Sequence, residues 1–155
     1  MIVLCFLIVI EYLCLPVICT SLKVPEFYKM IAQDKDDYAI LQIPQIPPPQ
    51  FLYYQTIHQK RMYGGYTSRI PESAFMKLKS SPVISDIFLN RYPLMTDGKR
   101  IPDLLAQKIV TTVFRINNIR YVILPNNVNN YFLNGYHFNE IYRDEIIRVF
   151  QPPQQ

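Results

Sequence analysis

Hydrophobic residues open the chain in one almost unbroken run. Residues 1–10 are all apolar, and a second, mostly apolar stretch follows Glu11 until Pro16 interrupts it. At about 1.5 Å per residue, roughly twenty helical residues cross the hydrocarbon core of a bilayer, which is about 30 Å thick. We therefore expect a membrane helix within residues 1–22, with Glu11 at the headgroups and Pro16 ending the helix. This segment would be the outer end of a longer span.

A cleaved secretory signal is the alternative for the same segment. Small residues near Cys19 and Thr20 suit a cleavage site, but no Lys or Arg precedes Lys23. Signal peptides usually carry positive charge ahead of their apolar core. The pattern favours the membrane helix and leaves the signal peptide open.

After the apolar run, helix and strand patterns alternate. A short helix is expected to begin near Pro25, because proline suits the first helical turn. Its apolar side consists of Phe27, Met30 and Ile31. Residues 38–43 are apolar on both faces of an extended chain. Such a strand is usually central in its sheet and covered by helices.

A second helix is predicted at residues 50–61. Its apolar side recurs at helical spacing, at Phe51, Tyr54 and either Ile57 or His58. Gly64 or Gly65 would then supply the left-handed residue that commonly ends a helix. The glycine pair thus has a structural explanation before any ligand is invoked.

The second half of the chain carries the most regular helical pattern, at residues 102–117. Its predicted buried stripe consists of Leu104, Leu105, Ile109, Val113 and Ile116. Shorter helices are expected within residues 71–78 and 82–93, and a loop at residues 95–102. Strands are expected at residues 119–124 and 145–151, with a weak helix between them.

Together these elements predict a small α/β domain with a short, mainly parallel sheet covered by helices. We expect three parts: a membrane helix at residues 1–22, the α/β domain at residues 23–150 and a disordered tail at residues 151–155.

Composition and charge narrow the classes of partner. The net charge is +4, and Lys and Arg are scattered among acidic residues rather than gathered in a stripe, which argues against nucleic-acid binding. The three cysteines, Cys5, Cys14 and Cys19, all lie in the first twenty residues. The rest of the chain therefore holds no disulfide and no cysteine-based zinc site. With only His58 and His137 as imidazoles, a metal site is not expected.

The most unusual segment is residues 47–69, which combines prolines, tyrosines, a glycine pair and basic side chains. Gly64 and Gly65 expose backbone N–H groups, and Ser68 and Arg69 offer polar groups to an oxyanion. Phosphate loops follow a strand and open a helix, whereas this segment follows a predicted helix. The sequence therefore favours a structural role over an anion site.

His58 is the candidate for acid–base chemistry in this segment. No Ser–His–Asp spacing, nucleophile elbow or carboxylate pair accompanies it. We expect His58 to brace the following loop through a hydrogen bond rather than to catalyse a reaction. The cluster of Asp34, Asp36 and Asp37 matches no calcium loop and is interpreted as a charged turn before a strand. The sequence thus indicates no catalytic residue and no cofactor.

Three stretches resemble a known class of membrane protein. They are residues 10–44, beginning IEYLCLPVICTS, residues 53–71, YYQTIHQKRMYGGYTSRIP, and residues 116–127, INNIRYVILPNN. They resemble the C-terminal part of polytopic membrane proteins of archaea and bacteria that look like GT-C-type glycosyltransferases, akin to the protein mannosyltransferases. In that class, the last membrane helix leads into an extracytoplasmic α/β domain.

The resemblance implies a function that depends on a membrane part. In such transferases the catalytic carboxylate lies in the first outer loop, and lipid-linked sugar binds within the membrane. Neither region matches any part of these 155 residues. The implied role is that of an accessory domain that does not transfer sugar by itself. The implied partners are membrane lipid, the membrane part of a glycosyltransferase-like protein and lipid-linked sugar.

The matched residues imply a surface that faces the membrane part, made of Tyr54, His58, Gly64, Gly65, Ser68 and Arg69. The implied location is the cell membrane, with the domain outside. Lys23 and Lys29 would by themselves favour a cytoplasmic domain, but many loops set the orientation of a polytopic protein. Two other hypotheses stay open: a secreted or singly anchored binding module without a transferase partner, and a soluble enzyme.

Overall fold

The computed structural model of the protein describes residues 21–43, 49–63, 76, 81–88, 95–96 and 99–153. The expected membrane helix lies outside these residues except for its last two positions. Within the described ranges, no helix is both long and apolar enough to cross a bilayer.

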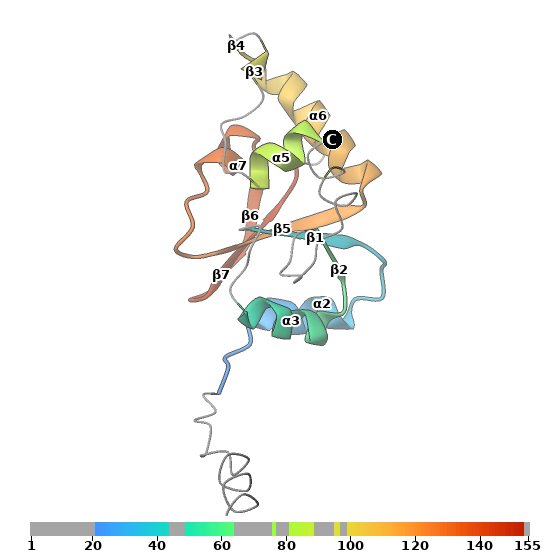
Figure 1. Ribbon diagram of the computed structural model, residues 1–155, viewed down its shortest axis with the longest axis vertical. Coiled ribbons are helices and arrows are strands. Elements are labelled where there is room, and N and C mark those ends of the chain that lie inside the picture. The colour runs from blue at the N-terminus through green and yellow to red at the C-terminus, as the bar shows by residue number, and fades with distance from the viewer. Residues whose placement is uncertain are drawn as a thin grey trace, which may run out of the picture.

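Helices and strands alternate along the chain (Figure 1). The helices are α2 (Glu26–Gln33), α3 (Gln50–His58), α5 (Pro82–Phe88), α6 (Asp103–Ile116) and α7 (Tyr131–Gly135). The main strands are β1 (Ala39–Gln42), β2 (Arg61–Tyr63), β5 (Ile119–Pro125), β6 (Asn139–Arg143) and β7 (Ile147–Gln151). A separate two-stranded hairpin is formed by β3 (Met95–Thr96) and β4 (Lys99–Arg100).

The main sheet has the order β2-β1-β5-β7-β6 and is mixed rather than mainly parallel. β1 runs parallel to both β2 and β5, whereas β7 runs antiparallel to β5 and β6. The small α/β fold and the central, fully buried β1 are confirmed. The sequence did not predict β6, because this edge strand exposes most of its residues and carries no apolar alternation.

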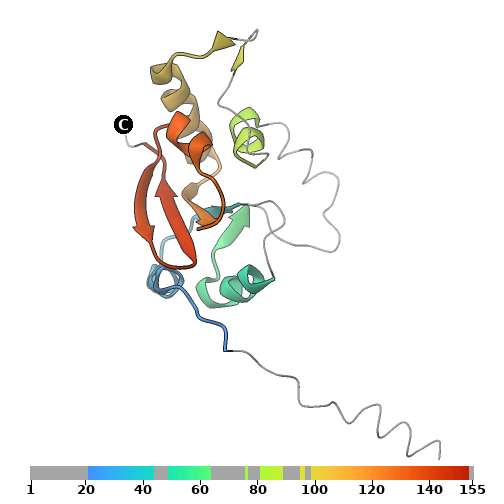
Figure 2. The same cartoon turned by 90° about the vertical axis from the view of Figure 1, so that its left-hand side faces the viewer.

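Helices cover both faces of the sheet (Figures 1 and 2). One face packs against α2 and α3 through a core that includes Phe27, Tyr28 and Ile40. The other face packs against α5, α6 and α7 through a core that includes Val110 and Phe114. The chain crosses from β1 to β2 through α3, and from β2 to β5 through α5 and α6. The two crossovers therefore use opposite faces.

The buried side of α6 differs from the predicted stripe. Ala106, Val110 and Phe114 face the sheet, each at most 3% exposed. Leu104 and Ile116 are exposed by 68% and 75%. Both sets repeat at helical spacing, one position apart, so periodicity could not choose between them. Leu105 is also exposed, whereas Ile109 and Val113 pack partly against the core.

Two local expectations are also corrected. Met30 of α2 is 56% exposed, and Tyr28 takes the predicted place in the core. Residues 95–102 were expected to form a loop, but they contain the antiparallel pair β3–β4, and Asp97-Gly98 stands between the two strands in sequence. Asp-Gly between two short strands is a strong hairpin signal. At the C-terminus, Gln151 still belongs to β7, and residues 154–155 lie outside the described chain.

The starts and ends of the parallel strands define two opposite edges of the sheet. We call the edge at which β1, β2 and β5 end the carboxyl edge, and the edge at which they begin the amino edge. The β6–β7 turn also lies at the carboxyl edge, because Asn126, just after β5, donates its backbone N–H to Ile146 O at 3.0 Å. In open α/β sheets, ligands usually bind at the carboxyl edge.

Candidate functional site

Two of the predicted site residues, Tyr54 and His58, lie on one side of α3. They are four residues apart, so they occupy adjacent turns of the helix. The ring of Tyr28, from α2, stacks on both: its centroid is 4.8 Å from that of Tyr54 and 5.3 Å from that of His58. Each of the three side chains is at most 2% exposed. In this structure Tyr54 and His58 are therefore core residues between α2 and α3.

Tyr54 also connects α3 to the beginning of the described chain. Its hydroxyl donates a hydrogen bond of 3.0 Å to the carbonyl oxygen of Lys23. The Lys23 ammonium pairs with Glu145 in the β6–β7 turn at 2.5 Å, and this contact raises the pKa of Lys23. The segment that follows the apolar run is thus fixed beside the carboxyl edge.

His58 braces the chain after α3, as expected from the sequence. Its Nδ1 accepts a hydrogen bond of 3.0 Å from the backbone N–H of Lys60. Its Nε2 is buried without a hydrogen-bond partner. Burial, together with the positive charge of Lys60, lowers the pKa of His58 to about 4. His58 is therefore neutral near pH 7.

The glycine pair does not end α3. The helix ends at Gln59, which has a left-handed φ of 55°, and Arg61–Tyr63 then form β2. Gly64, Gly65, Ser68 and Arg69 lie outside the described residues. The last described residue before them is Tyr63, at which β2 ends. The sequence argument against a phosphate loop assumed that this segment follows a helix, and that assumption was wrong.

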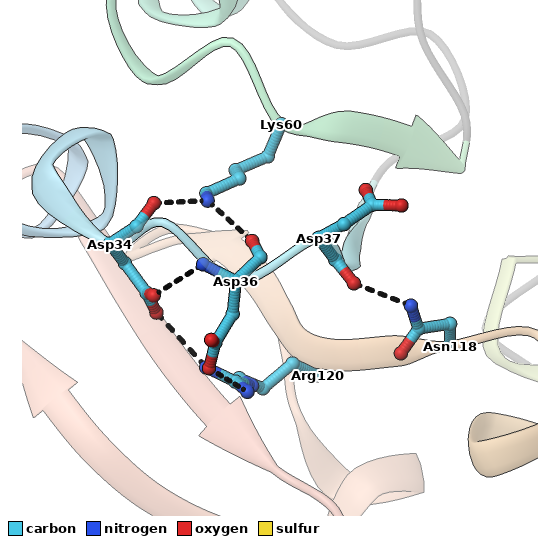
Figure 3. A network of polar contacts seen from close by, with 6 residues as sticks. All are labelled: Asp34, Asp36, Asp37, Lys60, Asn118 and Arg120. Carbon is cyan, nitrogen blue, oxygen red and sulfur yellow. Dashed lines mark hydrogen bonds and ion pairs between the residues drawn. The ribbon is translucent and has the colours of Figure 1, made fainter.

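A polar network that the sequence did not single out joins three strands at the amino edge (Figure 3). Arg120, at the start of β5, pairs with Asp34 at 3.0 Å and with Asp36 at 2.8 Å. Lys60, just before β2, donates to the carbonyl oxygens of Asp34 at 2.6 Å and of Asp36 at 2.8 Å. The loop before β1 is therefore bound to the starts of both neighbouring strands.

Asp37 extends the network on the other side of this loop. Its carbonyl oxygen accepts a hydrogen bond of 2.6 Å from the Asn118 side chain, and its carboxylate pairs with Arg61 at 3.2 Å. Asn118 has a left-handed φ of 52°, which asparagine tolerates well. The acidic turn that the sequence indicated is thus a junction between strands.

Tyr38 lies between the two cations of the network. The Lys60 ammonium is 4.5 Å from the centroid of its ring, and the Arg120 guanidinium is 4.2 Å away. Burial raises the pKa of Tyr38, and a hydrogen bond from the Asp36 backbone N–H lowers the pKa of Asp34. The hydrogen bond to Asp36 raises the pKa of Arg120. Near pH 7 the Asp34 carboxyl is therefore ionised, the Arg120 guanidinium is charged and the Tyr38 phenol is neutral.

The sequence contained a weak signal for this network. Lys60, Arg120 and the acidic turn each stand just before, or at the start of, a strand. Only the pairing of β1 with both β2 and β5 brings these starts together. Without that topology, the charges are indistinguishable from a solvated surface.

A groove of about 370 Å³ adjoins the network at the amino edge. It lies between α6, the start of β5 and the chain after β7. Its apolar lining includes Phe114, Ile119 and Pro152, and its polar lining includes Arg115 and Arg120.

Metal-binding side chains do not cluster in the part of the chain that the structure describes, since it contains no group of three or more His, Cys, Asp or Glu residues suited to a metal ion. His137 approaches Asp103 at 3.8 Å, and both side chains are largely exposed.

Comparison of the chain with protein-family models, with curated proteins and with solved structures finds no match.

Proposed function

We propose that the chain is a membrane-tethered, extracytoplasmic accessory domain of a GT-C-like glycosyltransferase and does not transfer sugar by itself. Residues 1–22 are embedded in lipid in this proposal. The carboxyl edge of the sheet faces the membrane part and lies near its lipid-linked sugar.

One observation supports the proposal: Lys23, which follows the apolar segment in sequence, and Tyr63, the last residue of β2 before Gly64, belong to the same edge of the sheet. Lys23 is held at this edge by Glu145 and by the Tyr54 hydroxyl. Tyr63, directly before Gly64 in sequence, is the last residue of β2. A membrane helix before Lys23 would thus place the segment of residues 64–69 on the membrane side of the domain.

The attachment at Lys23 also limits how far the domain can turn away from a bilayer. Val24 packs against the core beneath α2 and α3, directly after the anchored Lys23. In this proposal the connection between residues 1–22 and the domain is therefore short. A short tether keeps the effective concentration of the domain at its partner surface high.

Membrane attachment is tested by flotation of the full chain with liposomes. The wild-type chain is expected to float, and a variant with Phe6→Arg and Ile8→Arg is expected to remain at the bottom, because each buried arginine costs about 2.5–3.5 kcal/mol. The matched control is Met30→Arg, at an exposed position of α2, and it should float. A wild-type chain that stays in the soluble fraction contradicts the proposal.

The partner is tested by photo-crosslinking in the native host. A crosslinking amino acid at position 69 is expected to capture a polytopic membrane protein of the glycosyltransferase type. The same amino acid at Lys108, an exposed position on α6, serves as the control and should not capture it. Capture of lipid alone from position 69 contradicts the transferase role and supports a singly anchored module.

A further inference from the structure

We infer that the groove at the amino edge binds a small hydroxylated organic anion, such as an acidic sugar. This site lies at the edge opposite to the proposed membrane contact, so it does not depend on that proposal.

The groove has the size and apolar floor of a small-ligand site. Its volume of about 370 Å³ lies within the range in which proteins bind small molecules. Phe114 and Ile119 are buried core residues at its base, and Pro152 and Pro153 line it from the chain after β7. The hydroxyl of Thr111 lies 3.3 Å from the Pro153 carbonyl oxygen, which holds this chain along α6. The walls therefore belong to fixed elements.

The positive charge of the groove lining favours an anion as the ligand. Arg115 and Arg120 both line the groove, and none of the described lining residues is acidic. Asp34 and Asp36 balance the charge of Arg120 from outside the groove. Arg115, in the last turn of α6, takes part in none of the ion pairs of the described residues. Its guanidinium is thus available to a carboxylate or phosphate, which it can bind in a bidentate manner.

The remaining polar groups suit hydroxyls. Asn118 and Gln151 each present an amide, which can both donate and accept hydrogen bonds. The Asn118 amide nitrogen donates one of its two hydrogens to the Asp37 carbonyl oxygen, so its second hydrogen and its oxygen are left for a ligand hydroxyl. Because Asn118 and Arg120 are fixed by the network of Figure 3, little side-chain entropy is lost on binding.

The experiment is a calorimetric titration of the purified full chain with five probes: glucuronate, glucose 6-phosphate, glucose, acetate and inorganic phosphate. The two acidic sugars are expected to bind at least about 10-fold more tightly than glucose or either simple anion, because they engage both kinds of polar group. Which acidic sugar binds more tightly distinguishes a carboxylate ligand from a phosphate ligand. Amide NMR shifts should change at Asn118 and Gln151.

Variants locate the binding site. Arg115→Gln is expected to weaken binding of the acidic sugars by about 10-fold or more, with Arg115→Lys intermediate. Lys108→Gln removes another exposed cation of α6 and should change the affinity by less than about twofold. The inference is overturned by absence of saturable binding, by equal affinity for glucose, by equal affinity for acetate or phosphate, or by equal losses in Arg115→Gln and Lys108→Gln.

Discussion

The rings of Tyr28 and His58 stack with their centroids 5.3 Å apart and their planes inclined by 19°, in the interior between α2 and α3. Nδ1 of His58 accepts the Lys60 N–H, so the bonded ring must stay unprotonated at that atom. Protonation would place a charge in the core and remove the acceptor of the partly buried Lys60 N–H. The stack therefore favours the neutral imidazole.

This arrangement predicts a loss of stability on mild acidification. The pKa of His58 is about 4 in the folded chain, against an ordinary value of 6.5. Between these values the unfolded chain binds more protons, so stability is complete above about pH 6.5 and falls as the pH decreases toward 4. The expected loss is on the order of 2 kcal/mol, measured by urea unfolding of the full chain at pH 7.0 and pH 4.5.

Two variants distinguish the contribution of His58 to this pH dependence from the contribution of the carboxylates, which protonate mainly at lower pH. His58→Phe retains a ring for stacking and should lose most of the difference between the two pH values, although it is less stable at pH 7.0 because the Lys60 N–H loses its acceptor. His137→Gln changes the other imidazole of the chain, which is exposed, and serves as the matched control. A wild-type chain equally stable at both pH values would show that His58 is not held neutral by burial.

The Tyr54 hydroxyl is predicted to hold the segment at Lys23 and Val24 against the domain. Tyr54→Phe removes the hydrogen bond to Lys23 O and should reduce the free energy of unfolding by about 1 kcal/mol. Hydrogen exchange at Val24 and the first turn of α2 should accelerate, because this segment loses its attachment. Tyr53→Phe changes a neighbouring tyrosine that is 50% exposed and should leave exchange unchanged. Equal exchange in the two variants would show that the bond does not hold this segment.

The sequence predicted which segments form helices and strands better than it predicted which segments these contact. The strands 38–43 and 119–124 were found because each is mainly apolar, with Gln42 and Arg120 as the exceptions, and in the structure both lie inside the sheet. β2 was missed because Arg61–Tyr63 is three residues long and directly follows a helix. A short strand of this kind is specified by pairing with β1, which no local pattern reveals.

At the candidate sites, too, the sequence predicted local contacts and missed long-range ones. Sequence reasoning identified the hydrogen bond that His58 makes to its own loop, because that contact spans two residues. It assigned no role to Arg120, whose partner Asp34 lies 86 residues earlier in the chain. The groove beside Arg120 depends in addition on the chain after β7, which the sequence pattern marked only as a tail. The Arg120 network and the adjoining groove thus depend on contacts between residues far apart in sequence, which local sequence patterns do not predict.

Arg120 is predicted to be a main stabilising cation of the amino edge. Arg120→Leu removes two ion pairs and the contact with the Tyr38 ring, and should cost about 1–2 kcal/mol in urea unfolding. Arg61→Leu removes a single pair whose two side chains are more than 60% exposed, and should cost less than about 0.5 kcal/mol. Similar losses in the two variants would mean that the network adds nothing beyond ordinary surface pairing.

The largest change in stability is expected from a substitution on the buried face of α6. Phe114 is 1% exposed and packs edge-on against Phe138 with centroids 5.3 Å apart, so Phe114→Ala should cost about 3–5 kcal/mol. Leu104, which sequence periodicity assigned to the core, is 68% exposed, and Leu104→Ala should change stability by less than about 0.5 kcal/mol. Urea unfolding of both variants decides between the two faces of the helix. A large loss for Leu104→Ala with a small one for Phe114→Ala would mean that α6 packs on its predicted stripe, and the groove lined by Phe114 would then not exist in this form.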